Sequence, residues 1–531
     1  MRRERVFFER DWRGFMDDVE RMTPTGHGER VAVFRDPELA YPSTPPFNPP
    51  IEYPEYPFKG KGALDETNHV YAAVRETLRL LGLDEAHYDQ PNWNPLREIV
   101  TPGDRVVISP NFVMDYHINS ETIFSIATHG SVIRAIADYV EVALRGEGRI
   151  LFADAPQFNA RFERLIQQTG LEQVAQFYRK SSRVETGLMD LRRVRSTIQH
   201  GLVVDREVVD TFETESVIVD LGMDSMFPEL GETLSSLFGS DYDRRETCSH
   251  HNMTTNRYCL SKRVLESDVL IGVPKLKTHK KTGVTLSLKN FVGINTDKNF
   301  LPHYRVGDAL EGGDEFPIER DRLLRIKTKL VRKAIDCLLA RRGRAVAKIA
   351  SGLLPILFPV KERGAHRSEQ PQIDAFYRKF LHKSVRMGNW ESNDTTWRMV
   401  LDIARAFFYA GVDGKMQDTK QRRFFAVIDG IIGGDANGPM ASQPRREGVL
   451  VAGRDPVAVD FTAARIMGFE PMSLSTLARA MQEHRFRLGS AGNILLGTNW
   501  DDWTSGITPD KSLRFRAPDH WDSIVAWQRT H

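Results

Sequence analysis

The chain has 531 residues, of which 41% are hydrophobic and 27% charged, and this composition is ordinary for a globular protein. Its length allows two lobes with a sizeable core. The formal net charge of +2 at pH 7 argues against a nucleic-acid-binding protein, because such proteins are strongly basic. The sequence has no apolar run of about 18 residues and no signal-peptide core, so we expect neither a transmembrane helix nor secretion.

The three cysteines, Cys248, Cys259 and Cys337, are few and well separated. No two of them form a Cys-X-X-Cys pair, so we expect no iron–sulfur cluster. A low and odd number of cysteines is typical of a protein in a reducing compartment. We therefore predict a cytoplasmic protein.

Residues 1–95 are predicted to form a proline-rich arm and a helix. Eight prolines lie between Pro37 and Pro57, a density that excludes a helix or a central strand. Tyr and Phe residues lie among these prolines, which favours an arm that packs on the surface over a plain linker. Helical spacing of apolar residues then runs from Leu64 to Leu83.

Strand and helix patterns alternate in residues 96–318 and again in residues 388–500. This alternation predicts an α/β fold with mostly parallel sheets, flanking helices and two lobes. Residues 501–531 are predicted to be a C-terminal tail. The expected strands are 105–109, 149–153, 268–273, 424–428 and 448–452, and the clearest helices are 131–144, 395–409 and 457–468.

Residues 319–387 interrupt this pattern and are predicted to be a basic amphipathic helical insertion. Eleven Lys and Arg but only two Asp lie between Arg320 and Lys348, with apolar residues at helical spacing. An apolar stretch broken by two prolines follows. These features predict that residues 320–360 contact the anionic inner face of a membrane. The alternative is a helical hairpin that packs on the protein itself or on a partner subunit.

Polar residues directly follow several predicted strands, and in open α/β sheets ligands bind at the carboxyl ends of the strands. We therefore expect these residues to converge on one site. They are Asn111, Asp154, Lys275 and Asp429.

The densest group of polar residues lies in 274–303. If residues 275–279 are extended, Lys275, Lys277 and His279 share one face. Ammonium groups suit a phosphate or carboxylate, and an imidazole transfers protons near neutral pH. We predict that Lys277 and His279 are catalytic and that the ligand is bound by Lys275, Lys289, Asn290 and His303, together with Asn111 and Asp154. The alternative is a solvated basic loop.

A glycine-rich segment, residues 429–439, is predicted to be a second part of the site. Gly434 and Gly438 allow close approach of the backbone to a ligand, and Asn437 adds an amide. Asp429 is predicted to be a catalytic base, and Asp429 and Asp435 are candidate ligands of a divalent cation. A tight turn without a ligand is the alternative.

Two further residues are candidates for ligand binding. His129 precedes the helix predicted at 131–144, and the N-terminus of that helix can bind an anion. Arg398 lies one turn into the helix predicted at 395–409. Asp394 is placed to cap that helix.

Together these segments resemble the DUF362 family of uncharacterised proteins. The matching pieces are 103–111, Thr128-His129, 274–290, 429–439 and 454–460, in that order. The resemblance implies no established reaction. Some members carry ferredoxin-like cysteine clusters, which this chain lacks.

The sequence thus predicts an enzyme that acts on a phosphorylated or carboxylated small molecule, such as a sugar or a lipid-linked precursor. Lyase, isomerase and oxidoreductase chemistry all remain open. The second hypothesis is a membrane-peripheral binding or assembly protein without turnover.

Overall fold

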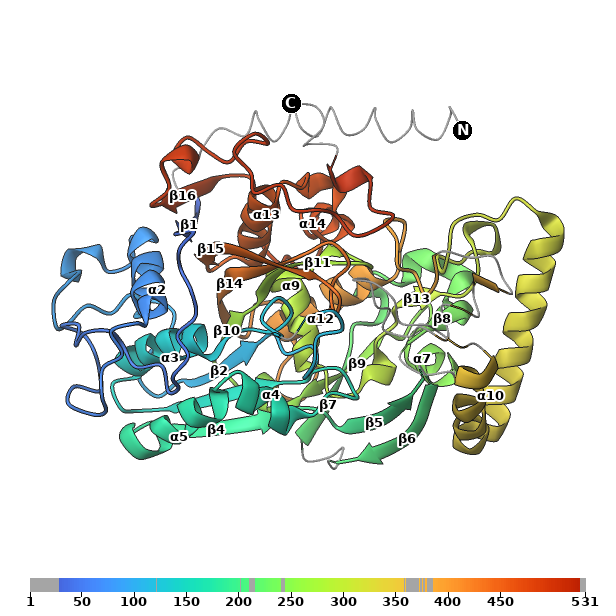
Figure 1. The fold of residues 1–531 in the computed structure, drawn as a ribbon, viewed down its shortest axis with the longest axis horizontal. Coiled ribbons are helices and arrows are strands. Elements are labelled where there is room, and N and C mark those ends of the chain that lie inside the picture. The colour runs from blue at the N-terminus through green and yellow to red at the C-terminus, as the bar shows by residue number, and fades with distance from the viewer. Residues whose placement is uncertain are drawn as a thin grey trace.

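The protein is seen in a computed structural model that describes residues 28–525, apart from Glu121, Gly201, 210–214, 240–243 and most of 358–384 (Figure 1). The side chains of residues 335–344 also lie outside the description. Residues 1–27 of the predicted arm region therefore lie outside the described chain. So do Phe358 and Val360 of the segment that is predicted to contact a membrane. The strands in chain order are β1 (Glu29–Arg35), β2 (Arg105–Pro110), β3 (Arg149–Asp154), β4 (Glu185–Asp190), β5 (Val194–Gln199), β6 (Leu202–Val208), β7 (Ser216–Asp220), β8 (Leu237–Phe238), β9 (Arg257–Ser261), β10 (Val269–Val273), β11 (Lys275–His279), β12 (Gly283–Val284), β13 (Tyr304–Arg305), β14 (Arg423–Asp435), β15 (Gln443–Gly453) and β16 (Ile494–Thr498).

The helices are spread along the whole described chain. They are α2 (His69–Leu80), α3 (Gly130–Leu144), α4 (Phe162–Gln168), α5 (Leu171–Ser181), α7 (Arg244–His250), α8 (Lys262–Leu265), α9 (Leu286–Asn290), α10 (Arg322–Leu357), α12 (Thr396–Tyr409), α13 (Pro456–Met467) and α14 (Ser475–Ala480).

A ten-stranded sheet forms the centre of the fold. Its strand order is β16-β1-β15-β14-β10-β2-β3-β4, with β11 and β12 joined to it through β14. The strands from β14 to β4 pair in parallel, whereas β15 is antiparallel to both of its neighbours. The predicted α/β class with a mostly parallel sheet is confirmed.

Helices cover both faces of this sheet. Successive residues of a strand point to opposite faces, so each face has its own apolar side chains for helices to cover. In β10, Val269 and Ile271 face a core that α2, α3 and α5 help to form, whereas Leu270 faces the core of α9, α12 and α13. Strands buried on both faces have nearly continuous apolar sequences, which explains why the sequence revealed them.

Both ends of the described chain contribute strands to this sheet. β1, from the predicted arm region, pairs with β15 and β16. The segment predicted as a C-terminal tail buries Trp503 and Phe515 in the core. The sheet therefore joins segments that the sequence boundaries separate.

The proline-rich arm packs on α3 through a buried charged network. Arg134 of α3 is fully buried and pairs with Asp138 at 2.9 Å. The guanidinium also donates hydrogen bonds to the Pro46 carbonyl and the Asn48 side chain, both at 2.9 Å, and to the Tyr56 hydroxyl at 3.0 Å. These three acceptors all belong to the arm, so the prediction that the arm packs on the protein is confirmed.

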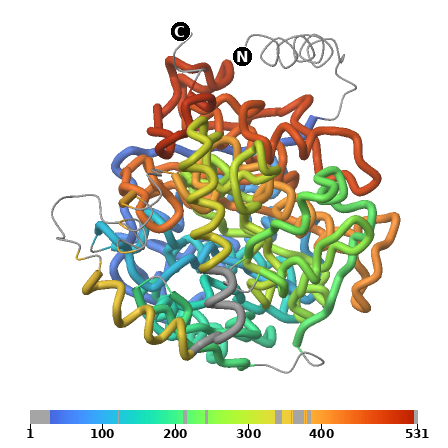
Figure 2. Tube along the Cα trace, turned by 90° about the vertical axis from the view of Figure 1, so that its right-hand side faces the viewer, coloured from blue at the N-terminus to red at the C-terminus, as the bar shows by residue number. Residues whose placement is uncertain are grey.

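The basic insertion forms one long helix, α10, which continues through Pro355. α10 lies against β6 and stands at the right-hand edge of the molecule in Figure 1. Figure 2 shows the same helix running across the face turned toward the viewer. Within the part of the chain that the structure describes, no helix is both long and apolar enough to cross a membrane.

Removal of the buried guanidinium should destabilise the protein. Arg134→Met is expected to lower the free energy of unfolding by about 3 kcal/mol or more, because Asp138 stays buried without its cationic partner. The control is Arg149→Met, which breaks an exposed ion pair with Glu185 and should cost less than about 1 kcal/mol. Urea unfolding followed by tryptophan fluorescence measures both variants, and equal unfolding midpoints would contradict this account of the arm.

Candidate functional site

The candidate site begins where β11 leaves the end of β10. β11 runs beside the second half of β14, so that Lys275 lies opposite Asp429 and Lys277 lies opposite Gly434. Because residues 275–279 form a strand, Lys275, Lys277 and His279 alternate onto one face, as the sequence predicted.

Lys275 and Asp429 form a buried ion pair that also binds the N-terminal arm. Their side chains are fully buried, and Lys275 Nζ lies 2.9 Å from Asp429 Oδ2. Tyr41, from the arm, accepts a hydrogen bond from Lys275 Nζ at 2.7 Å and donates one to Asp429 Oδ1 at 2.6 Å. We call these three residues the inner triad.

His129 completes the surroundings of the inner triad. Its backbone N–H donates to Asp429 at 3.1 Å, and its ring stacks on Tyr41 with 4.2 Å between centroids. Burial and then the nearby Lys275 lower the pKa of His129 to about 3, so its ring is neutral at pH 7. Its Nδ1 accepts a hydrogen bond from the backbone N–H of Ser131 and caps α3. His129 and Asp429 therefore already have partners within the protein.

A group of cationic and imidazole side chains lies beyond the inner triad. We call it the cation cluster, and its members are Lys277, His279, Lys281, Lys289, Lys298 and His303. Burial, and then Lys289 and Lys275, hold the pKa of Lys277 well below its usual range. Burial and then Lys298 lower the pKa of Lys289 to about 8. These mutual effects show that positive charges from β11, α9 and the following segment converge.

Lys277 and Lys289 lack acidic ion-pair partners. Lys277 Nζ donates to the carbonyl oxygen of Ile126 at 2.7 Å. Among the described residues, no carboxylate forms an ion pair with Lys277, and Lys289 has no hydrogen-bond or ion-pair partner. Asp154 attracts Lys277 more weakly than the neighbouring lysines repel it. The excess positive charge is therefore not neutralised by those neighbours.

The two histidines of the cation cluster carry their protons on opposite nitrogens. His279 accepts the N–H of Lys281 at Nδ1, so its neutral ring has the proton on Nε2. His303 lies 2.8 Å from the carbonyl oxygen of Leu301 through Nδ1, which must donate, so its Nε2 keeps a lone pair. Burial and nearby lysines lower the pKa of both rings, that of His303 to about 3. The cluster thus offers one imidazole donor and one imidazole acceptor.

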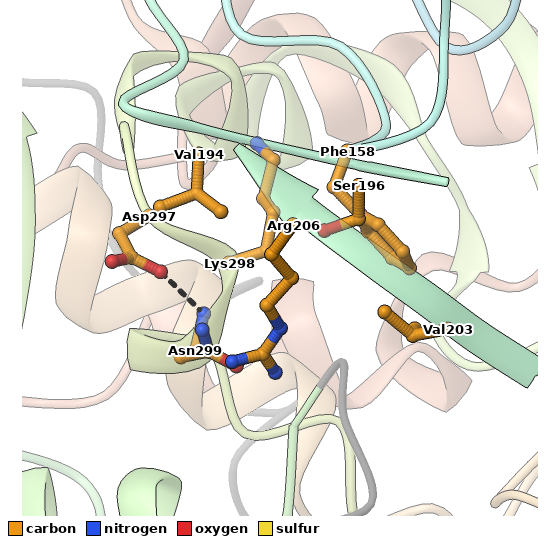
Figure 3. Close-up of a pocket in the computed structure, with 8 residues that line it drawn as sticks. All are labelled: Phe158, Val194, Ser196, Val203, Arg206, Asp297, Lys298 and Asn299. Carbon is orange, nitrogen blue, oxygen red and sulfur yellow. Dashed lines mark hydrogen bonds between the residues drawn. The ribbon is translucent and has the colours of Figure 1, made fainter. Parts of the chain in front are cut away.

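Asp154 and Lys298 lie at the end of β3. Burial raises the pKa of Asp154 well above its usual range, and Lys298 opposes that rise. Lys298 Nζ donates to the carbonyl oxygen of Ala155 at 2.8 Å. Its side chain also lines a small pocket of about 10 Å³, where Figure 3 shows it extending away from the guanidinium of Arg206.

Asp460 holds α9, the short helix that carries Lys289, in place. Its carboxylate accepts the backbone N–H groups of Ser287 at 2.7 Å and Leu288 at 2.8 Å. Burial raises the pKa of Asp460 to about 7. At the other end of α9, Asn290 donates to the carbonyl oxygen of Ser109 at the end of β2 at 3.1 Å. α9, which carries Lys289, is thereby held by α13 on one side and by the sheet on the other.

Asn111 joins the same region through a shared acceptor. Its side-chain amide donates to the Ile126 carbonyl at 2.7 Å, and this is the oxygen that accepts from Lys277. The structure therefore brings Asn111, Asp154, Lys277, His279, Lys289, Asn290 and His303 into one region, while Lys275, Asp429 and His129 lie beneath it.

The glycine-rich segment differs from the loop expected from the sequence. β14 continues through Asp435, and neither Gly434 nor Gly438 has a positive φ. A Cβ placed on Gly434 would lie 2.7 Å from Cβ of Lys277, and one on Gly438 would collide with the carbonyl oxygen of Thr278. These glycines therefore let β14 and the following turn approach β11, instead of forming an open cradle for an anion.

Three other predicted residues are engaged elsewhere. Arg398 donates to Asp394 and to Glu229. The N-cap of α12 is Thr395, not the predicted Asp394, and the Asn393 side chain accepts the backbone N–H of Thr396. Asn437 exchanges hydrogen bonds with Asp519 of the C-terminal segment. Arg398 and Asn437 thus serve contacts within the protein.

The geometry gives no support to a divalent cation on Asp429 and Asp435. Asp429 binds Lys275 and Tyr41, and Asp435 forms an ion pair with Arg516 at 2.7 Å. Nowhere in the described chain do three His, Cys, Asp or Glu side chains gather so that they could hold a metal ion. Sequence reasoning missed Tyr41 and Arg516, since neither stands in a recognisable motif.

Comparisons with known proteins give a family and a short local likeness. A family model described as a domain of unknown function, DUF362, matches residues 186–465. A thylakoid-associated protein from Synechocystis sp., sll1697, is 38% identical over 53 residues, which are 10% of this chain and 16% of that protein. The chain thus matches about a sixth of that relative. No solved structure matches the chain.

The matched region contains β11, α9, Asp429 and Asp460, whereas Tyr41, Asn111 and His129 precede it. The pieces of the resemblance at 103–111 and 128–129 therefore lie outside that region. Because the model covers more than half of the 531 residues, the protein belongs to the DUF362 family.

Proposed function

We propose that the protein is an enzyme that binds a phosphorylated or carboxylated small molecule at the cation cluster. The observation that supports this proposal is the excess positive charge around Lys277 and Lys289, which no carboxylate of the described chain pairs with. A partly buried ammonium group without a counter-charge is costly, and an anionic ligand removes this cost. Two lysines on separate elements suit a group with several acceptor oxygens.

The histidines extend the proposal from binding to proton transfer. Both rings are neutral in the free protein, and an anion bound beside them raises their pKa toward neutral pH, where an imidazole accepts and returns a proton. His279 presents Nε2–H and His303 presents a free Nε2 lone pair. An anion held by Lys289 between these rings meets a proton donor and a proton acceptor. His279 is the residue that we assign to proton transfer.

The alternative is a protein that holds the same anion without turnover. Both functions require the cation cluster, and only the enzyme requires His279 to exchange protons. Anion binding and proton transfer are therefore tested separately below.

Loss of the Lys289 ammonium should weaken anion binding. Sulfate is the probe, and Lys289→Met is expected to reduce its affinity by about tenfold to a hundredfold, the usual effect of removing a hydrogen bond to a charged group. The control is Lys415→Met, since Lys415 is 80% exposed in a turn. Isothermal titration calorimetry at constant ionic strength measures the affinity. If both variants bind sulfate as the wild type does, Lys289 has no part in anion binding.

Anion affinity should fall as the pH rises through about 8. The pKa of Lys289 is about 8, so this lysine is charged at pH 7 and largely neutral at pH 9. Sulfate does not titrate in this range, so its affinity should fall by about tenfold for each lysine of this kind that contacts it. Lys298, with a pKa also about 8, adds to the fall if it reaches the anion.

The variant Lys289→Arg separates the contribution of Lys289. Arginine keeps its charge to pH 9, so the fall in affinity should become smaller by about tenfold. An unchanged pH profile in this variant would mean that another group governs the titration.

Replacement of His279 should separate chemistry from binding. His279→Gln is expected to bind sulfate within about twofold of the wild type, because the lysines that attract the anion remain. Deuterium incorporation from heavy water into sugar phosphates and hydroxy acids, followed by mass spectrometry, reports proton transfer to carbon. We expect incorporation by the wild type and its loss in the variant. Equal incorporation by both proteins would remove His279 from the chemistry.

A further inference from the structure

We propose that α10 docks the protein on an anionic lipid bilayer through a stripe of exposed apolar side chains. In the first half of the helix, Leu323 is 78%, Ile326 47% and Leu330 63% exposed. The last nine residues of the helix expose four more large apolar side chains. They are Ile349, Leu353, Ile356 and Leu357. Monomeric proteins rarely leave such a patch uncovered on one element.

The apolar stripe of the first half lies on the outer side of the helix. Leu323, Ile326 and Leu330 follow one another at intervals of three and four residues, which places them on one face. The opposite face of this first half packs on the protein, because Thr328 is buried and Arg332 pairs with Glu315; in the second half Ala347 and Ser351 are buried. α10 therefore already has a face that packs on the protein, and the outer stripe is left for a partner.

The charges of α10 identify the chemistry of that partner. Residues 322–357 contain ten Lys and Arg but a single acidic residue, Asp336. Lys327, Lys329 and Lys333 are exposed beside the apolar stripe in the first half of the helix, and Lys348 is exposed in the second half. A helix with an apolar face and flanking cations lies in the interface of an anionic bilayer, with its apolar side chains among the acyl chains.

Other partners fit these features less well. A second copy of the chain would bring two strongly basic helices together, and their like charges repel. A nucleic acid would pair with the lysines but would leave the leucines and isoleucines in water. A bilayer surface is the partner that accepts both the charge and the apolar stripe.

Contacts in the first half of α10 hold it rigidly on the protein. Arg332 forms an ion pair with Glu315 at 2.8 Å and donates to the hydroxyl of Tyr304 at 3.0 Å. Tyr304 follows His303 of the cation cluster directly in the chain. Docking of α10 would therefore bring the bilayer close to this side of the cluster. The docking surface itself does not depend on the proposed anion binding.

Vesicle co-sedimentation of the full chain tests the proposal. The vesicles contain phosphatidylcholine alone or with about 30% phosphatidylglycerol, at about 0.1 M and about 1 M salt. We expect binding to the anionic vesicles at low salt and much less binding at high salt or to the neutral vesicles.

Two sets of substitutions test which side chains act. Leu323→Gln, Ile326→Gln and Leu330→Gln together should weaken vesicle binding at least tenfold. Lys327→Gln, Lys329→Gln and Lys333→Gln together should weaken it by about a hundredfold. The matched control combines Ile51→Gln, Leu64→Gln and Val412→Gln, whose side chains are similarly exposed elsewhere at 55%, 45% and 58%, and it should bind as the wild type does.

Several outcomes would overturn the proposal. They include failure of the wild type to bind anionic vesicles, equal binding by the stripe variant and the control, and equal binding to neutral and anionic vesicles. Sedimentation velocity provides one further test of the proposal. If the wild type is a dimer that does not bind vesicles, and the stripe variant is a monomer, the stripe belongs to a contact with a second copy of the chain. All substituted side chains are exposed, and far-ultraviolet circular dichroism verifies that each variant is folded.

Discussion

The geometry of the candidate site depends on the buried ion pair between Lys275 and Asp429. Charged groups without access to water are tolerated only when they are paired and hydrogen-bonded, and Tyr41 together with the backbone of His129 supplies the remaining hydrogen bonds. This requirement fixes the register of β11 against β14. Because alternate residues of a strand share a face, it also fixes the side to which Lys277 and His279 point.

The contrast between two lysines of one strand is what points to a ligand. Lys275 has a carboxylate within 3 Å, whereas Lys277, two residues later, has a backbone carbonyl and repelling lysines. The same burial therefore has opposite consequences at the two positions. At Lys275 it produces a closed and satisfied contact that stabilises the fold. At Lys277, and at Lys289 across from it, it leaves charge that a ligand can neutralise, as expected of a binding site.

Local patterns in the sequence predicted the parts of the fold that local physics decides. The apolar runs of β2, β3 and β10 identified buried strands, and alternation placed Lys275, Lys277 and His279 on one face. Partners from distant segments could not be predicted, since Tyr41 lies 388 residues from Asp429 and Arg516 lies 81 residues from Asp435. The glycines of β14 were misread for a related reason. A glycine that lets two strands approach each other looks the same in sequence as one that contacts a ligand.

The net charge of +2 conceals two concentrations of positive charge that differ in kind. In the cation cluster, burial lowers the pKa of Lys277, Lys289 and Lys298, so their charge is sensitive to pH. The lysines of α10 are exposed beside apolar side chains and suit an extended anionic surface. The hydrogen bond from Arg332 of α10 to Tyr304, the residue after His303, connects the two regions. A substrate whose anionic group is attached to a lipid would meet both kinds of charge in sequence, first the surface and then the cluster.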